Sequence, residues 1–181
     1  MIKKILSLFL GLALLLSCAS ALAGGEAVTV DVRGRFQLKG ILPEGYTLTI
    51  PSQDETQLDG IISSGDPEAP VIKLYIAFND SYAAVNTLAD VSADDLSQIK
   101  DSFTEEYTVT FSDMNTAAGL PMLVTRGTDI PDFLDFYTIF LGHEIELALY
   151  YENDNANKTL TEDQLALCTE FARTLELVPL Q

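Results

Sequence analysis

The chain has 181 residues, with 27 acidic and ten basic side chains, and carries a formal net charge of −17 at pH 7. This excess of carboxylates argues against nucleic acid and anionic membrane surfaces as partners, because both are bound through basic groups. The single histidine also excludes any zinc site that needs two histidine ligands.

The first 23 residues have the three parts of a secretory signal peptide. Lys3 and Lys4 come first, an apolar run over residues 5–16 follows, and Ala21-Leu22-Ala23 then places small residues before Gly24. A run of about twelve residues is too short for a permanent membrane helix, which takes roughly 20. We therefore expect residues 1–23 to be removed between Ala23 and Gly24, and the mature protein to be exported, secreted or bound to the cell envelope, without a transmembrane helix.

A second interpretation of this leader stays open. Leu15-Leu16-Ser17-Cys18 resembles a bacterial lipobox, in which Cys18 would become the lipidated first residue. The residues that follow, Ala-Ser-Ala-Leu-Ala, are a poor tether, which favours cleavage after Ala23. That cleavage leaves eight basic and 27 acidic residues, a net charge of −19, and Cys168 as the one cysteine. An internal disulfide is then impossible, and the apolar core must hold the fold.

The mature part divides into a lead-in with a first strand over residues 24–33 and one domain over residues 34–181. Val28, Val30 and Val32 alternate with polar residues, which is the period of a half-buried strand. Further strands are expected over residues 34–38, 47–50, 58–64 and 71–78, and Pro51 is expected to end the second of these.

The second half predicts helices and a hairpin. A helix is expected after Ser92, a hydroxyl N-cap followed by acidic residues. Strands over residues 107–111 and 122–126 come next, and residues 133–141 and 144–151 then flank Gly142-His143 as an antiparallel hairpin. The capping box Thr161-Glu162-Asp163-Gln164 begins a closing helix. This order predicts an α+β fold, a single domain in which helices cover an antiparallel β-sheet.

The order of these motifs resembles one family. The resemblance depends on four features: Leu42-Pro43-Glu44-Gly45-Tyr46, Ala118-Gly119-Leu120-Pro121 before a strand, the hairpin over residues 133–151 and the closing helix. They are similar to the PsbP-like fold, which includes the extrinsic subunit of the plant oxygen-evolving complex, the Ran-binding Mog proteins and many secreted bacterial proteins. The resemblance implies a compact sheet with helices packed on it, usually without a catalytic centre, in proteins that mostly bind or stabilise other proteins.

The nearest approach to a reactive cluster is His143 beside Glu144 and Glu146, which we treat as surface candidates. A general base needs an orienting carboxylate and a substrate pocket, whereas residues 143 and 144 of one strand point to opposite faces. We expect His143 to be a solvated turn residue and Cys168 a small apolar core residue. No catalytic residue, metal ligand or cofactor is therefore predicted.

The acidic residues leave a cation hypothesis open, provided that the fold gathers them: Asp129, Asp132, Asp135, Glu144 and Glu146. The prediction for the whole protein is an exported, non-enzymatic binding or accessory domain at the bacterial cell envelope, with an unknown protein or envelope ligand as its partner. One alternative is a secreted hydrolase that uses a carboxylate pair, at the roughly 5–10 Å separation of glycosidases. The other is a lipoprotein anchored through Cys18.

Overall fold

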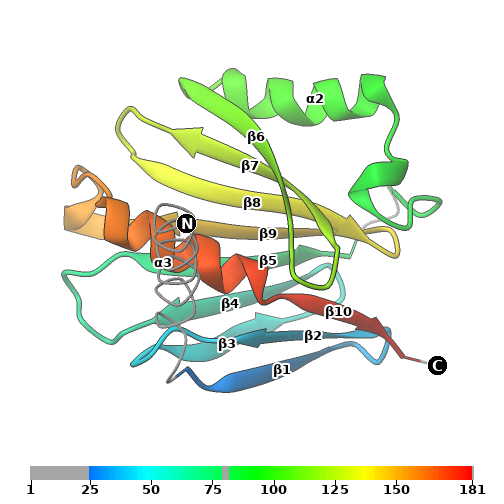
Figure 1. Cartoon of the computed structure of the whole chain (residues 1–181), viewed down its shortest axis with the longest axis horizontal. Helices are drawn as coiled ribbons and strands as arrows, with labels where there is room; N and C mark the ends of the chain where they lie inside the picture. Colours follow the sequence, from blue (N-terminus) through cyan, green and yellow to red (C-terminus); the bar gives the residue numbers. More distant parts are fainter. Residues whose placement is uncertain (1–24, 79–81, 181) are drawn as a thin grey trace, which may run out of the picture.

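The computed structural model describes residues 25–78 and 82–180. The predicted signal peptide and its processing residues, Cys18, Ala23 and Gly24, lie outside the described residues. The described chain builds two β-sheets and two α-helices, α2 (Ala93–Thr104) and α3 (Glu162–Arg173). Figure 1 shows these helices on different sides of the larger sheet. The α+β class expected from the sequence is confirmed.

The smaller sheet joins the two ends of the described chain. Its strands lie in the order β1-β2-β10 and are all antiparallel. Their bounds are β1 (Ala27–Val32), β2 (Phe36–Ile41) and β10 (Glu176–Pro179). The valine alternation that predicted β1 is confirmed, since Val30 and Val32 are buried. The sequence did not indicate β10, which is only four residues long and has Pro179 as its last residue.

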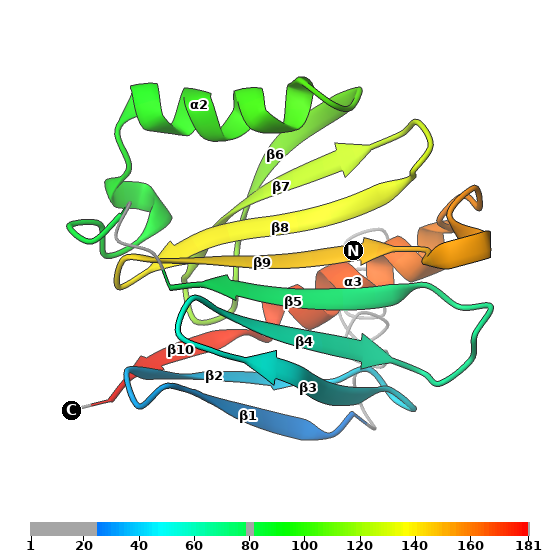
Figure 2. The ribbon, with the colours of Figure 1, turned by 180° about the vertical axis from the view of Figure 1, so that it is seen from behind.

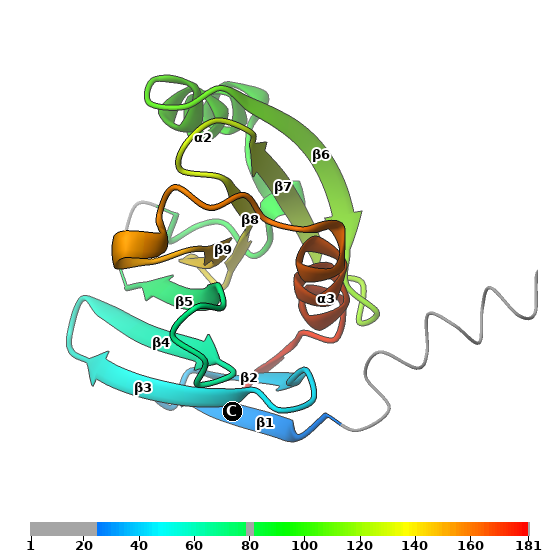
Figure 3. The same ribbon diagram turned by 90° about the vertical axis from the view of Figure 1, so that its left-hand side faces the viewer.

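The larger sheet has seven antiparallel strands in the order β3-β4-β5-β9-β8-β7-β6. Five of them are β3 (Thr47–Gln53), β4 (Gln57–Ser63), β5 (Val71–Ala77), β6 (Val109–Asn115) and β7 (Pro121–Gly127). The central hairpin is formed by β8 (Phe133–Phe140) and β9 (His143–Tyr150). The views in Figures 2 and 3 show this sheet curving around α3, with the smaller sheet beneath it.

The main core fills the space between the two sheets and α3. Alternate residues of the central strands enter it, and α3 contributes Cys168, Phe171 and Ala172, which are all buried. The capping box that predicted this helix is present: the Thr161 side chain accepts a hydrogen bond from the backbone N–H of Gln164, and the Gln164 side chain accepts one from the Thr161 N–H. Cys168 is the buried core residue that the sequence indicated.

A second, smaller core lies on the opposite face of the larger sheet, under α2. The Ser92 side chain caps this helix by accepting a hydrogen bond from the Asp95 N–H at 3.1 Å. Ile99 of α2 is buried against Leu123, Tyr137 and Ile139 of the sheet. The helix therefore covers part of this face, which we call the outer face.

Two predicted boundaries are wrong for tertiary reasons. The strand expected to end before Pro51 continues to Gln53 as β3, with a register shift between Thr49 and Ser52. Proline removes a ladder donor, but β3 is an edge strand, where one missing donor and a bulge are tolerated.

The turn of the central hairpin lies one residue earlier than predicted. Leu141 and Gly142 occupy it with φ values of 49° and 81°, so His143 is the first residue of β9. Two positive φ values are what a tight two-residue hairpin turn requires. The neighbouring segment stabilises the turn, because the Leu141 N–H donates to the Asn86 carbonyl at 2.9 Å and the Gly142 N–H to that of Val85 at 2.8 Å.

Between residues 25–78 and 82–180, the chain forms no helix that is both long enough and apolar enough to cross a membrane.

Candidate functional site

The outer face carries a set of polar and aromatic side chains in the middle of the sheet. Strand alternation places Glu144, Glu146 and Tyr150 of β9 on this face, while the intervening residues of β9 enter the main core. The pairing register puts Glu146 directly between Tyr75 of β5 and Tyr137 of β8. Glu146 is therefore at the centre of the face that α2 covers only in part.

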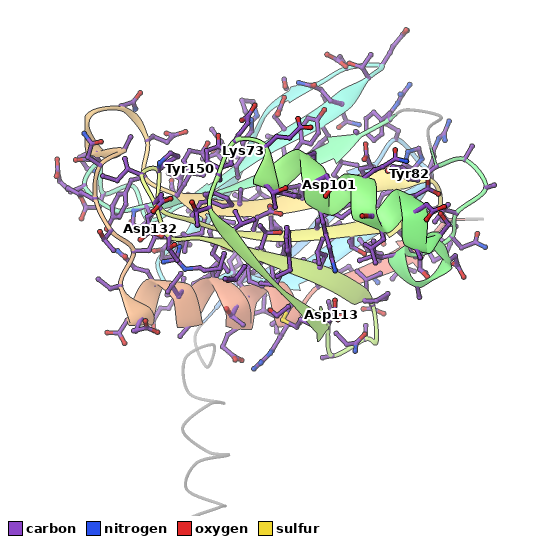
Figure 4. All side chains as sticks on the ribbon, turned by 90° about the horizontal axis from the view of Figure 1, so that it is seen from above. Lys73, Tyr82, Asp101, Asp113, Asp132 and Tyr150 are labelled. Atoms are coloured by element: carbon purple, nitrogen blue, oxygen red, sulfur yellow. The ribbon has the colours of Figure 1, made fainter. Side chains whose placement is uncertain are left out.

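This part of the outer face is hollowed beside α2, and we call the hollow the trough. One end has a volume of about 330 Å³ and is lined by Phe103, Tyr107, Pro131, Phe133, Asp135, Glu146, Ala148 and Tyr150. The other end has a volume of about 350 Å³ and is lined by Tyr82, Gln98, Ile99, Ser102, Phe103, Tyr137, Glu144 and Glu146. Figure 4 shows Tyr150 beside one end of α2 and Tyr82 beside the other. Glu146 borders both ends.

The floor of the first end is a pair of carboxyl groups, Asp135 and Glu146. Asp135 is 1% exposed, and neither of its oxygens accepts a hydrogen bond of ordinary geometry from the described residues. Burial raises the pKa of Asp135 well above its usual range, and the charge of Glu146 and a hydrogen bond with its carboxyl raise it further. Two carboxylates cannot hydrogen-bond each other, so a hydrogen bond between these groups forms only when one of them holds a proton, and the raised pKa of Asp135 favours the proton there.

Glu146 is the more accessible partner of the pair. Burial raises its pKa, whereas the hydrogen bond from Asp135 and the charge of Lys73 on β5 act in the opposite direction. Lys73 itself lies 3.7 Å from an Asp59 carboxylate oxygen (Nζ to Oδ1) and is half exposed. The pair therefore resists carrying two full negative charges, because ionising both neighbouring groups in a buried position is unfavourable.

A second acidic residue, Glu144, has a different environment at the other end of the trough. The Tyr137 hydroxyl donates a hydrogen bond to Glu144 Oε1 at 2.8 Å. Burial, and then the charge of Glu144, raise the pKa of the Tyr137 hydroxyl far above its usual value. The two ends of the trough thus present a proton-sharing carboxyl pair and a tyrosine–glutamate pair.

His143 is separate from both glutamates, and its predicted role as a solvated turn residue is wrong. It is 4% exposed, and its ring lies on the core side of β9, stacked on Phe36 at 5.9 Å and edge-on to Phe78 at 5.6 Å between ring centroids. Arg35 Nη1 lies 3.1 Å from His143 Nε2. The register of β9 is the reason, since moving the turn by one residue brings residue 143 into the strand on its inward face.

Of the acidic residues in the cation hypothesis, the structure brings Asp135, Glu144 and Glu146 to the trough, whereas Asp132 has other partners. The Asp132 carboxylate pairs with Arg126 and accepts a hydrogen bond from the Leu160 N–H at 3.0 Å, which ties the loop before β8 to the segment before α3. Within residues 25–78 and 82–180, no group of three or more His, Cys, Asp or Glu side chains is placed to hold a metal ion. The Cys168 thiol is remote from the surface, and burial raises its pKa.

The sequence indicated that Glu144 and Glu146 share one face, and it grouped Asp135 with them only in the cation hypothesis, not among the surface candidates. The available signal was an acidic residue inside the apolar run of residues 133–140, because a charged side chain in a buried strand needs a partner. The aromatic walls of the trough are harder to predict from the sequence, because their residues are far apart along the chain. Phe103 and Tyr107 come from α2 and the turn after it, far in sequence from Phe133 and Tyr150.

The fold and the site together define an α+β domain with an acidic, aromatic trough on one face of its larger sheet. No family model matches the chain, and a search of curated proteins finds no match. The structure is similar to the solution structure of cyanobacterial PsbP (CyanoP) from Synechocystis sp. PCC 6803, with 14% sequence identity and a TM-score of 0.49. The match covers 87% of this chain and 94% of that one. The PsbP-like family is the one whose motif order the sequence resembles.

Proposed function

We propose that this chain is an exported, non-enzymatic binding or accessory domain of the bacterial cell envelope, and that it binds its ligand in the trough. The main support for this proposal is the trough, an aromatic-walled hollow with the Asp135–Glu146 pair on its floor. Ligand sites are concave and largely apolar, with a few convergent polar groups, and the trough has this composition. The signal-like leader over residues 1–23 supports export.

The rival function, a hydrolase with a carboxylate pair, has less support. Glycosidases hold their two carboxyl groups roughly 5–10 Å apart, to leave room for a water molecule or the anomeric carbon. Asp135 and Glu146 are instead neighbours on adjacent strands, since Asp135 pairs with Ala148, and each carboxyl group shifts the pKa of the other. His143 cannot assist either group, because it lies on the core side of β9.

Export is tested by expressing the full chain in a bacterial host and measuring where it accumulates and at what mass. Cleavage after Ala23 gives a mature protein that begins at Gly24, and this protein is expected outside the cytoplasm. Labelling with an alkyne fatty acid distinguishes the lipoprotein, since label that is lost in Cys18→Ser would identify Cys18 as the anchor. Accumulation of the uncleaved chain in the cytoplasm would overturn the proposal.

Binding in the trough is tested by comparing which components of the cell envelope are retained by the wild-type protein and by two charge-reversed variants of strand residues on the larger sheet. Glu146→Lys is expected to lose the component that the wild-type protein retains, because the substitution places a cation on the trough floor. Asp113→Lys on β6 makes the same change in net charge, and Figure 4 places Asp113 away from Tyr150 and Lys73. Equal retention by wild type and Glu146→Lys would contradict the assignment of the trough.

A further inference from the structure

Two neighbouring buried polar side chains, Asp135 on the floor of the trough and Thr125 on the next strand, are poorly satisfied by the described part of the chain. Asp135 is 1% exposed and its oxygens accept no hydrogen bond of ordinary geometry from the described residues. Thr125, directly opposite Asp135 in the β7–β8 register, is also buried, and its hydroxyl has no partner there either. A buried polar group without a partner costs about 1–3 kcal/mol, so such groups in one place indicate a site rather than a packing detail.

The walls around this floor are aromatic. Phe103, Tyr107, Phe133 and Tyr150 surround the carboxyl pair, and the rings of Tyr107 and Phe133 meet edge to face at a centroid distance of 5.2 Å. Aromatic faces attract cations, and they also bury the hydrocarbon part of a ligand. The volume of about 330 Å³ is at the lower end of the range for small-molecule sites, roughly 300–1,000 Å³.

We propose that this end of the trough binds a small organic cation, with its ammonium group at the Asp135–Glu146 pair and its hydrocarbon part against the aromatic walls. The inference deepens the binding role proposed above and does not depend on export. A hard divalent ion is less well matched, since calcium takes six to eight oxygen ligands and the floor offers two carboxyl groups among apolar rings. An anion is excluded by the charge of the floor.

Binding of the cation is coupled to a proton. Burial and the neighbouring Glu146 favour a proton on Asp135 in the empty site, and an ammonium group that donates hydrogen bonds to both carboxylates displaces that proton to solvent. Other titratable or charged groups face the pair or act on it: Lys73 on β5, Glu144 and Tyr150 on β9, Tyr107 after α2, and the Cys168 thiol from α3 across the sheet. Affinity for the cation should therefore rise with pH, because the proton and the ligand compete for the same carboxyl groups.

The test is calorimetric titration of the protein, as purified from the expressing cell, with n-butylammonium and benzylammonium chloride. Benzyl alcohol serves as the neutral analogue. We expect both amines to bind, and benzylammonium to bind at least tenfold more tightly than benzyl alcohol. We expect Glu146→Gln and Asp135→Asn each to weaken amine binding about tenfold or more, and Asp113→Asn, which changes the net charge equally, to leave it within twofold.

Two further measurements complete the test. Affinity of the wild-type protein should rise at least fivefold between pH 5.5 and pH 8, with protons released on binding, and this dependence should flatten in Glu146→Gln. A blocked Gly-Lys-Gly peptide presents the same butylammonium group as a lysine side chain. Tighter binding of the peptide than of n-butylammonium would identify a lysine side chain as the source, and weaker binding a free amine.

Three outcomes would overturn the inference: no amine binding at millimolar concentration, equal binding of benzyl alcohol, or equal weakening by Asp113→Asn. Each of these leaves the envelope experiment with Glu146→Lys unaffected, so failure of the ligand class is distinguishable from failure of the proposed function. Asp135→Asn and Glu146→Gln are near-isosteric, and the thermal unfolding of each variant shows whether it is folded.

Discussion

The two faces of the larger sheet are built from alternate residues of the same strands, yet they have opposite chemistry. On β9 the inward residues His143, Ile145, Leu147 and Leu149 are all buried in the main core. The outward residues Glu144, Glu146, Ala148 and Tyr150 are only partly buried and line the trough or its rim. Because the side-chain period of a strand is two, one short sequence specifies both the core and the site.

The inward face contributes most of the stability, whereas the outer face contains the proposed binding site. The inward face is covered by α3 and the smaller sheet, and apart from His143 and Thr138 its residues on the central hairpin are apolar. The outer face is covered by the single helix α2 and keeps a buried carboxyl group, Asp135. Retaining such a group costs folding free energy, which is a common property of ligand sites.

The largest expected effect is on the inward face. Leu147→Ala removes a side chain that is 1% exposed at the centre of the main core. We expect it to lower the free energy of unfolding by about 3 kcal/mol, because it loses buried apolar surface and leaves a cavity. Denaturant unfolding measures this change. A loss below about 1 kcal/mol would mean that the inward face is not the main source of stability.

A smaller effect is expected for His143→Ala. His143 faces the core, whereas the next residue, Glu144, faces the trough, so this variant tests whether the two faces have separate roles. The substitution removes the ring contacts with Phe36 and Phe78 and the contact with Arg35. We expect a loss of about 2 kcal/mol in unfolding free energy, with amine binding in the trough unchanged within twofold. The opposite result, intact stability with lost binding, would place His143 in the site.

The smallest expected effect has the opposite sign and depends on pH. Burial, then the charge of Glu146, raise the pKa of Asp135 in the folded protein. The stability that its protonated form contributes is complete below the unfolded pKa, about 3.9, and is lost as the pH rises through the folded pKa. An asparagine side chain at this position cannot ionise and therefore avoids that loss.

We thus expect Asp135→Asn to stabilise the protein at pH 7 by about 1 kcal/mol, or roughly 2–4 °C in melting temperature, and to have little effect near pH 4. Thermal unfolding from pH 4 to pH 8 gives the two curves, with Asp113→Asn as the control for net charge. A destabilising effect at pH 7 would show that Asp135 is a structural partner of Glu146 and that the outer face carries no energetic penalty.

Much of the fold was predictable because local signals agreed with the tertiary structure. The two helices begin at side-chain caps on Ser92 and Thr161, and their apolar stripes enter the two cores. The strands that alternate clearly were also found. The errors fell where distant contacts decide: β3 continues through Pro51 because it is an edge strand, and β10 forms only because β2 offers it a partner.

The candidate site was predictable only in part for the same reason. Alternation along β9 places Glu144 and Glu146 on one face, and that much is a local property. The partner of Glu146 is Asp135, on the next strand of the sheet, and the aromatic walls come from α2 and the turn after it. His143 was assigned to the wrong environment because the hairpin turn depends on carbonyl groups of Val85 and Asn86, which are far from it in sequence.

The sequence by itself determined the α+β class, the helix boundaries and the two-faced character of the central strands, because caps and periodicities act over a few residues. It also determined the acidic charge and the signal-like leader. Only the tertiary structure decided which outward residues meet. Strand order brings Asp135 against Glu146, and α2 closes one side of the space above them. Pairing of strands is a long-range event, so the proton-sharing pair and its trough follow from the sheet and not from any one segment.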